Sequence, residues 1–211
     1  MLLPYVELRH VDETIGYGTF ATRFIPKGTI TWVRDAFDQA FSPAAIETLH
    51  PLHRAILDKY SYSDASGDRI LCWDHGRFVN HSCEPTCLAP GFQFEIAVRD
   101  ILPGEQITDE YGTLNTDAFT CHCGQPRCRG VVQLDDILVY GEAWDEILSA
   151  AFPAVGNVPQ PLWDLVKEKD EVAGVLAGLT PLPSCRLHAL GARASDQRYE
   201  RQPRAAESQM R

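Results

Sequence analysis

The sequence has no long hydrophobic run and few basic residues. It holds no stretch of about eighteen apolar residues, so we expect no membrane-spanning helix. The first ten residues do not resemble a signal peptide. We therefore expect an intracellular protein, in the cytoplasm rather than the nucleus. Lys and Arg number 19 against 29 Asp and Glu, for a formal net charge of −10. This charge argues against nucleic acid as the main partner and suits a basic protein segment, although solubility alone also explains it.

The cysteines are concentrated in one short segment. The chain has seven, and an odd number argues against a framework of disulfides. Cys121, Cys123 and Cys128 fall within eight residues of polar sequence, a spacing that favours metal binding over ordinary buried thiols. A closed structural zinc site needs four ligands in a tetrahedron, so a fourth must come from elsewhere. Spacing leaves five candidates open: Cys72, Cys83, Cys87, His122 and Cys185.

Short alternating segments and frequent turns predict a mainly β fold. Apolar and polar residues alternate most clearly over 92–98, which predicts a half-buried strand there. Ser42 and Pro43 are typical of the N-cap and first residue of a helix, which we expect to be interrupted at Pro51 and to end at Tyr60. The remaining expectations are a polar loop over 61–68 and strands over 5–11, 19–25, 29–33 and 106–110.

The spacing of apolar residues predicts an α-helical extension after the cysteine-rich segment. Trp144, Leu148 and Ala151 share one helical face, and Leu162 and Val172 share another, with a break between the two helices. We expect both helices to pack on the β core and to help close the site, and a dimer face is the alternative that the sequence leaves open. From residue 191 onward the chain has almost nothing to bury, so a disordered tail is predicted.

Three further motifs carry chemistry only in combination. The run Gly16-Tyr17-Gly18 lets a backbone approach a ligand closely, but a hairpin turn explains it equally well. It is not a dinucleotide fingerprint, because the third glycine and a βαβ unit are missing. Asn80-His81 offers an amide and an imidazole, and Tyr111 offers a hydroxyl on a rigid apolar ring. Taken alone, Tyr111 reads as a core tyrosine.

Together, these motifs resemble a SET-domain protein lysine methyltransferase with a post-SET zinc knuckle and no cysteine-rich pre-SET segment. The resemblance covers about residues 5–130. It rests on four segments in the family's order: Gly16-x-Gly18, Arg77-Phe-Val-Asn-His-Ser-Cys83, Gly104-Glu105 leading to Tyr111, and Cys121-x-Cys123-x4-Cys128.

The resemblance implies a β-clip-like fold of small sheets, in which the chain around Tyr111 threads beneath a loop near Asn80 as a pseudoknot. A C-terminal α-helical extension follows. The implied organisation is a SET domain over 1–116, a post-SET zinc knuckle over 117–132, the helical extension over 133–190 and the tail over 191–211.

The resemblance also implies the ligands and their residues. S-adenosylmethionine would be the methyl donor, zinc the structural metal, and a lysine of a basic protein the acceptor. The zinc ligands would be Cys83, Cys121, Cys123 and Cys128. The catalytic residues would be Tyr111, His81 and Trp32. The donor would be held by Gly16, Tyr17, Gly18, Arg77, Asn80, His81, Tyr111, Phe119 and His122.

Methyl transfer to lysine needs a neutral amine aligned with the donor's methyl group. Desolvation beside a sulfonium cation disfavours the ammonium form, so we expect a narrow channel to lower the lysine pKa, with loss of the proton to solvent. Tyr111 would line the channel and orient the amine.

Two residues depart from the family pattern. Trp32 stands where a second channel tyrosine is usual, and Asp109 stands where an aromatic residue is usual. Asp109 either places a carboxylate near the lysine or faces solvent. These departures leave two alternatives, a catalytically weak SET module that binds a partner, and a zinc-stapled interaction domain of another fold.

Overall fold

The computed structural model describes residues 1–191, and most of the predicted tail lies outside them. Within this range the strands form four small sheets. A helical extension follows them in the chain, so the expected fold class is confirmed. Within the same range, no helix combines the length and apolar character needed to cross a membrane.

The first sheet brings three distant segments together in the order β1-β2-β10-β7. Its strands are β1 (Val6–Asp12), β2 (Gly16–Ala21), β7 (Asn80–His81) and β10 (Gln106–Asp109). β10 pairs in parallel with β7, with Asp109 opposite His81. The chain that leads into Tyr111 therefore lies beside the Asn-His pair.

The strand predicted over 19–25 instead runs over 16–21. The side chain of Asp12 accepts hydrogen bonds from the backbone N–H groups of Thr14 and Ile15. This closes the hairpin turn early, so pairing begins at Gly16, where φ is +82°.

The second sheet forms the core, in the order β3-β9-β8. Its strands are β3 (Ile30–Val33), β8 (Cys87–Leu88) and β9 (Phe94–Ala97). β9 is the central strand, and Phe94, Ile96 and Ala97 are all buried. The prediction of a strand here is confirmed, but the prediction that it is half-buried is wrong, because both of its faces are covered.

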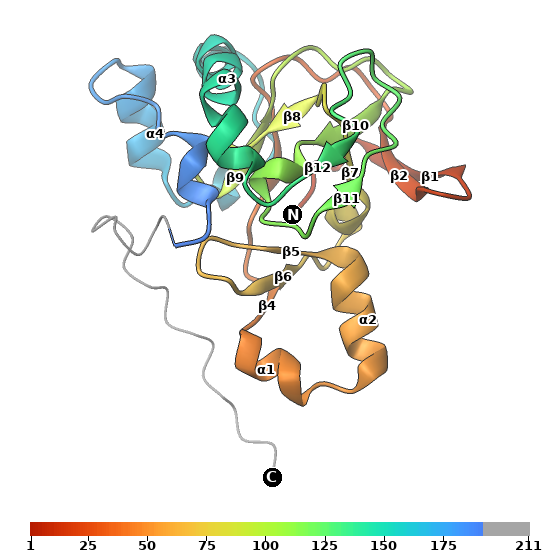
Figure 1. The fold of residues 1–211 in the computed structure, drawn as a ribbon. Coiled ribbons are helices and arrows are strands. Elements are labelled where there is room, and N and C mark those ends of the chain that lie inside the picture. Colours follow the sequence, from red (N-terminus) through yellow and green to blue (C-terminus); the bar gives the residue numbers. More distant parts are fainter. Residues whose placement is uncertain (192–211) are drawn as a thin grey trace.

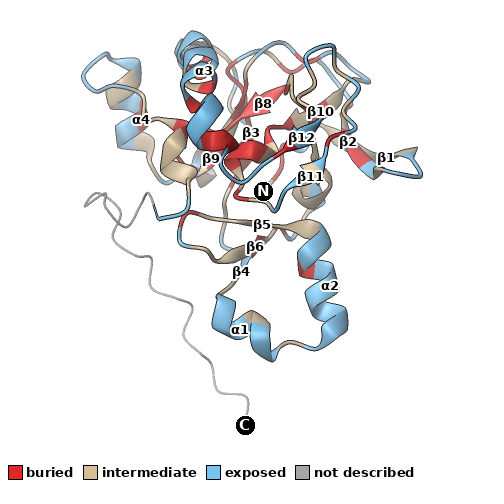
Figure 2. Cartoon of the chain, in the orientation of Figure 1, coloured by how far each residue is buried: buried red, intermediate tan, exposed pale blue. Residues whose placement is uncertain are grey.

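A third sheet and two helices form a lobe beside the core (Figure 1). The sheet joins β4 (Gln39–Phe41), β6 (Arg69–Leu71) and β5 (Ser61–Ser63). The helices are α1 (Pro43–Thr48) and α2 (Pro51–Tyr60), which are mostly exposed (Figure 2). The Ser42 side chain caps α1, as predicted. The predicted loop over 61–68 is partly wrong, since its first three residues form β5.

The fourth sheet pairs β11 (Phe119–Thr120) with β12 (Val131–Val132) and brackets the cysteine-rich segment. The helical extension holds α3 (Asp136–Ala151) and α4 (Lys169–Leu176). Trp144 and Leu148 of α3 join the same core as Ile30 and Phe94, so the expected packing of the extension is confirmed. Short 3-10 helices complete the described range: His75–Phe78, Tyr111–Thr113, Phe152–Asn157, Trp163–Leu165 and Cys185–His188.

The second helix of the extension differs from its prediction. Leu162, Leu165 and Val172 do not share one helix, because the chain makes a 3-10 turn at Trp163–Leu165 before α4 begins. Leu162 and Val172 are nevertheless both buried. Both positions are apolar because they are buried, and no continuous helix joins them.

Candidate functional site

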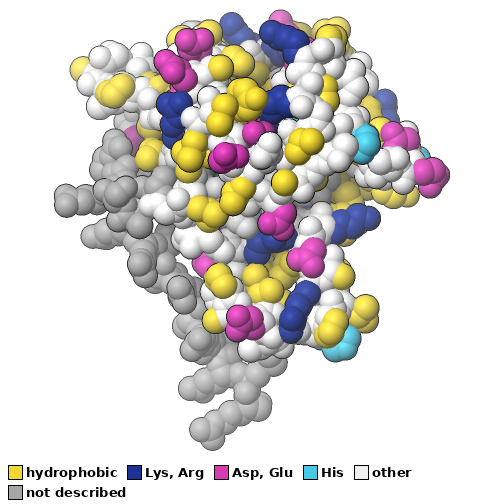
Figure 3. Space-filling view, viewed as in Figure 1, with side chains coloured by type: hydrophobic (Ala, Val, Ile, Leu, Met, Phe, Trp, Pro, Cys, Tyr) yellow, Lys and Arg dark blue, Asp and Glu magenta, His cyan; other side chains and the backbone are white. Residues whose placement is uncertain are grey.

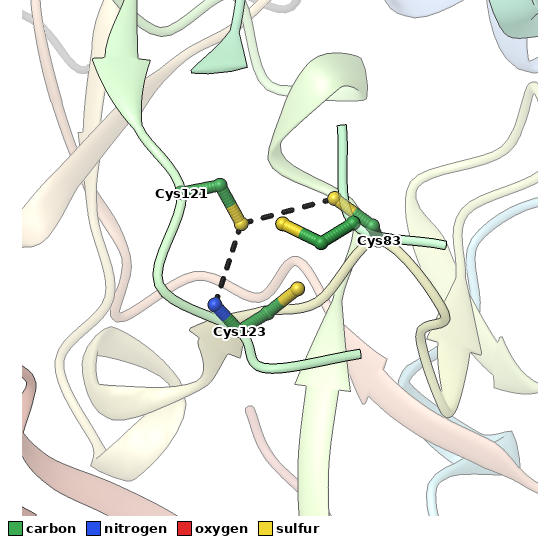
Figure 4. A group of neighbouring side chains, drawn as sticks. Cys83, Cys121 and Cys123 are labelled. Atoms are coloured by element: carbon green, nitrogen blue, oxygen red, sulfur yellow. Dashed lines mark hydrogen bonds between the residues drawn. The ribbon is translucent and has the colours of Figure 1, made fainter. Parts of the chain in front are cut away.

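Four cysteine sulfur atoms converge from two distant segments (Figure 4). The Sγ atoms of Cys83, Cys121, Cys123 and Cys128 all lie within 4.8 Å of one another. Cys83 Sγ and Cys121 Sγ are 3.8 Å apart. With a zinc–sulfur distance of about 2.3 Å, a regular tetrahedron has sulfur–sulfur edges of about 3.8 Å. The cluster therefore has the ligand type, number and spacing of a structural zinc site.

His81 connects this cluster to the segment that carries Tyr111. Its Nε2 lies 3.3 Å from Cys83 Sγ, and its Nδ1 lies 3.2 Å from the backbone nitrogen of Tyr111, from which it accepts a hydrogen bond. Burial, followed by the nearby Arg129 charge, lowers the pKa of His81 to about 4. A neutral ring that accepts at Nδ1 carries its hydrogen on Nε2, facing the sulfur. Both ring nitrogens are thus engaged by protein groups.

Tyr111 is held at both its backbone and its hydroxyl. The hydroxyl donates to the carbonyl oxygen of Val79 at 2.6 Å. The ring packs against Phe119 and His81, with centroids 6.0 Å and 5.6 Å away. Burial raises the pKa of the Tyr111 hydroxyl well above its usual value. The phenol is therefore fixed in position and stays protonated at neutral pH.

Glu110, the residue before Tyr111, is fully buried in a network of ion pairs. Arg129 donates to both of its carboxylate oxygens at 2.7 Å. The same guanidinium lies 3.0 Å from Asp136 and over the ring of Tyr140. Arg129 follows Cys128 directly, so this network ties the cysteine cluster to α3 and to the Tyr111 segment.

The Gly16–Gly18 run expected to hold the donor lies in β2, beside Asn80 of β7. The Asn80 side chain donates to the carbonyl oxygen of Tyr17 at 3.0 Å. A Cβ atom on Gly18 would lie 2.7 Å from the Asn80 amide nitrogen and 2.4 Å from that of Gln106, so a larger residue there would displace both side-chain amides. Gly16 faces open space. Glycines let the backbone of β2 lie close to a ligand, and the Asn80 amide beside it is fixed by its hydrogen bond.

The remaining donor-site predictions are less closely grouped. Phe119 contacts both His81 and Tyr111. The Arg77 guanidinium donates to the backbone carbonyl oxygens of Trp73 and Asp74. His122 is exposed, and its charge contributes to lowering the pKa of Asp12, after the hydrogen bonds from Ile15 and Thr14. This places His122 near the β1–β2 turn, and no described contact joins it to the Tyr111 rings.

A cavity of about 1740 Å³ opens between the lobe and the core. Tyr111, Phe119, Arg77 and Trp32 line it, whereas His81 and the Gly16–Gly18 strand do not. Over the face seen in Figure 3, acidic and basic side chains are interspersed rather than grouped by sign. The helical extension reaches the cavity through Lys167 and His188, which agrees with the expectation that it helps close the site.

Sequence reasoning missed two cavity residues. Tyr62 of β5 packs edge-on against Trp32, with ring centroids 6.1 Å apart. It places a phenol ring beside Trp32, whose indole has no hydroxyl. Tyr62 lies in a segment that was predicted to be a polar loop. Glu95 of β9 pairs across the sheet with Trp32 and also lines the cavity. The alternation over 92–98 gave no sign that its polar face meets an internal cavity.

The uncertainty over Asp109 is resolved by the structure. The side chain is 2% exposed and lines the cavity, so it does not face solvent. Burial raises its pKa to about 7. Neither of its carboxylate oxygens accepts a hydrogen bond of ordinary geometry from an N–H or hydroxyl group of residues 1–191.

Comparison with known proteins agrees with this geometry. The family model for the SET domain matches residues 16–112. A histone-lysine N-methyltransferase, H3 lysine-36 specific, from Cryptococcus neoformans var. neoformans serotype D is 31% identical over 138 residues, covering 58% of this chain and 16% of that protein. The one from Schizosaccharomyces pombe is 28% identical over 138 residues, covering 58% of this chain and 17% of that protein.

A histone-lysine N-methyltransferase, H3 lysine-4 specific, from Schizosaccharomyces pombe is 42% identical over 62 residues, covering 26% of this chain and 7% of that protein. The chain thus spans only about a sixth of the length of the first relatives it matches. The matched region of this chain contains β2, the Asn80-His81 pair and Tyr111. Residues 16–112 of this chain thus match the SET domain.

Proposed function

We propose that this protein transfers methyl groups from S-adenosylmethionine to a lysine side chain of a basic protein. The observation that carries the proposal is the fixed Tyr111 hydroxyl at the cavity wall, within a SET domain whose relatives are named as histone-lysine methyltransferases. The alternative of a catalytically weak binding module is not favoured by these relatives.

Cys83, Cys121, Cys123 and Cys128 would hold zinc in a closed site. Four thiolates leave no open position for substrate, so the metal would be structural. Its effect on the site would pass through Cys83 to His81 and through Arg129 to Glu110. We therefore assign His81 a positioning role, because its ring nitrogens are engaged by Cys83 and Tyr111 and it does not line the cavity.

The donor would lie along the Gly16–Gly18 strand and beside Asn80, with Phe119 covering part of it. S-adenosylmethionine supplies an activated methyl group on a sulfonium when bound. Gly18 keeps the strand close to the Asn80 amide, and Phe119 adds an apolar wall. The Arg77 guanidinium turns toward the backbone carbonyl oxygens of Trp73 and Asp74, so it would support the donor site through these segments.

The lysine would enter the cavity between the lobe and the core. Tyr111 and Tyr62 place two rings around this space, and aromatic rings favour a cationic methylammonium product. Trp32 closes one wall, with Tyr62 packed edge-on against it. The lysine would thus meet the fixed Tyr111 hydroxyl at the wall of this cavity.

The relatives' names point to a histone substrate and to the nucleus. The nuclear location conflicts with the expectation from sequence that the protein lies in the cytoplasm rather than the nucleus. We therefore drop the cytoplasmic expectation. Histone tails are rich in lysine and suit the −10 charge of this chain.

The direct test is incubation of the zinc-loaded protein with core histones and S-adenosylmethionine labelled in its methyl group. We expect label on histone lysine residues, mapped by mass spectrometry. The Tyr111→Phe variant, which retains the ring, is the matched control. Label that appears equally with this variant, or no label with the wild-type protein, contradicts the proposal.

A further inference from the structure

The cavity wall contains buried polar groups that lack hydrogen-bond partners, and such burial costs free energy. Both carboxylate oxygens of Asp109 and the indole Nε1 of Trp32 are buried without hydrogen-bond partners. Elsewhere in residues 1–191, unpartnered buried groups are threonine hydroxyls and one guanidinium nitrogen whose residue is otherwise paired. An ionised carboxylate is far more costly to bury unpaired than a hydroxyl. Asp109 therefore needs a compensating group, because no N–H or hydroxyl of residues 1–191 donates to its oxygens with ordinary hydrogen-bond geometry.

Glu95 lies next to Asp109 on the same cavity wall. The two carboxyl groups are within hydrogen-bonding reach of each other. Two ionised carboxylates cannot form that bond, because neither has a hydrogen to donate. A proton on Glu95 completes it, and burial raises the pKa of Glu95 well above its usual value. Above about pH 7, where Asp109 is ionised, the pair thus holds one proton and one negative charge.

The charged and titratable groups that face this pair are few. Glu110, on the chain next to Asp109, turns to Arg129 instead. No buried arginine or lysine meets the pair among the described residues. The groups whose charge acts on the pair, or that feel its charge, are Glu110, Tyr111, Cys72, Cys87 and the amino group of Met1.

We propose that the Glu95–Asp109 carboxyl pair receives the ammonium group of the substrate lysine and accepts its proton before methyl transfer. This rests on the proposed function and departs from the expectation that the proton is lost to solvent alone. Asp109, as the group that would touch the ammonium, is the catalytic residue. Glu95 is a positioning residue, because it acts through its bond to Asp109.

The step balances in protons and charge. One N–H bond of the lysine ammonium breaks and an O–H bond forms on the Asp109 carboxylate, which leaves a neutral amine and a neutral acid. The amine lone pair then forms the N–C bond as the donor's S–C bond breaks, and the electron pair stays on sulfur. The product methylammonium carries the positive charge. Asp109 returns its proton to solvent after the product leaves.

The geometry fits an alkylammonium better than a metal ion. A primary ammonium offers three donors, which match the carboxylate oxygens of Asp109 and the lone pairs of the Tyr111 hydroxyl. That hydroxyl donates to Val79 and so remains free to accept. A hard divalent cation needs six or more oxygen ligands, and two carboxyl groups fall far short.

The first test uses n-butylammonium chloride, which presents the lysine head group without a peptide. Calorimetry at pH 7.5 on the zinc-loaded full chain, with S-adenosylhomocysteine present, is expected to show binding that weakens at least tenfold in Asp109→Asn. The matched control is Asp117→Asn, which removes an exposed acid that lines the same cavity and is expected to leave the affinity unchanged. No binding to the wild-type chain, or equal binding by wild type and Asp109→Asn, overturns the proposal.

The second test observes the shared proton directly, by infrared difference spectra across pH. The carbonyl band of a protonated carboxylic acid is expected at pH 9, where Asp109 is ionised, in the wild-type chain and is expected to disappear in Glu95→Gln. A band that persists unchanged in Glu95→Gln overturns the shared proton.

Methyl transfer to core histones by the same preparations distinguishes the proposed methyltransferase function from the proposed role of the Glu95–Asp109 pair. Wild-type chain that binds butylammonium but labels no histone lysine leaves the acid pair standing and counts against the proposed function. Wild-type chain that labels histones, with Asp109→Asn retaining the same kcat and pH profile, overturns the acid pair and leaves the function standing. We expect Asp109→Asn to lower kcat and to lose the rise in rate near pH 7, with little change in KM for the donor.

Discussion

Asp109 and Glu110 are adjacent, acidic and almost completely buried, yet their surroundings are opposite. Glu110 faces the cysteine cluster and α3, and Arg129 donates to both of its oxygens. Asp109 lines the cavity, and neither of its oxygens has a hydrogen-bond donor of ordinary geometry among residues 1–191. Successive residues of a strand point to opposite faces, so one chain segment serves both sides. The Glu110 charge is balanced by Arg129, whereas the Asp109 charge has no arginine or lysine beside it in the hydrogen bonds and ion pairs of residues 1–191 and is the one we assign to the substrate lysine.

The first prediction tests the structural side of this comparison and has the largest expected effect. Arg129→Ala leaves Glu110 as a buried, uncompensated charge, which costs about 3–5 kcal/mol in the free energy of unfolding. Urea unfolding of the zinc-loaded protein measures it. Arg127→Ala, in the same segment, removes an exposed ion pair with Glu84 and should cost less than about 1 kcal/mol. Equal losses for the two variants would show that the Glu110 network is not a structural anchor.

The second prediction concerns Tyr111, which follows the two acids. Tyr111→Phe removes the hydroxyl that donates to Val79, so we expect the rate of methyl transfer to fall by about two orders of magnitude. Stability should fall by only about 1 kcal/mol, and donor affinity should be kept. Tyr5→Phe, whose ring lies outside the cavity, is the matched control. Turnover that is the same for both variants would remove Tyr111 from the mechanism.

The third prediction tests the unpaired side. Burial raises the pKa of Asp109 from 3.8 to about 7, so proton binding stabilises the folded state. That stabilisation is complete below the ordinary value of 3.8 and is lost as pH rises through about 7. Asp109→Asn carries no charge at any pH. The Tm of this variant relative to wild type should therefore increase from pH 4 to pH 7 and then level off. A Tm difference that is constant with pH contradicts the raised pKa.

The smallest expected effect is that of salt on turnover. A net charge of −10 attracts a basic substrate from a distance, and salt screens this attraction within about 10 Å at 0.1 M. We expect kcat/KM for core histones to fall several-fold between 50 and 300 mM KCl, with kcat nearly unchanged. A kcat/KM that is independent of salt would exclude electrostatic steering.

Much of this arrangement could be predicted from sequence where a local pattern sufficed. The Ser42-Pro43 cap and the three clustered cysteines each carry their signal within a few residues. Cys83 could not be chosen by spacing, because the pairing of β7 with β10 and the course of the later chain decide which thiol meets the cluster. The family resemblance supplied that choice.

The acid pair could not be predicted, because it depends on tertiary contacts. Glu95 reads as an outward polar residue on an alternating strand, and Asp109 as a surface acid near a turn. Only the meeting of β9 and β10 at one cavity places their carboxyl groups together. Tyr62 was missed for the same reason, since its segment looks like a loop until it pairs with β6.

The central claim is that residues 16–122 around the cysteine cluster form a binding site for the methyl donor. Calorimetric titration of the zinc-loaded chain with S-adenosylmethionine tests it most directly. We predict saturable binding of one donor per chain, weakened when Cys123→Ser releases the metal. No heat change and no other sign of donor binding, in protein shown to contain one zinc per chain, would contradict the account.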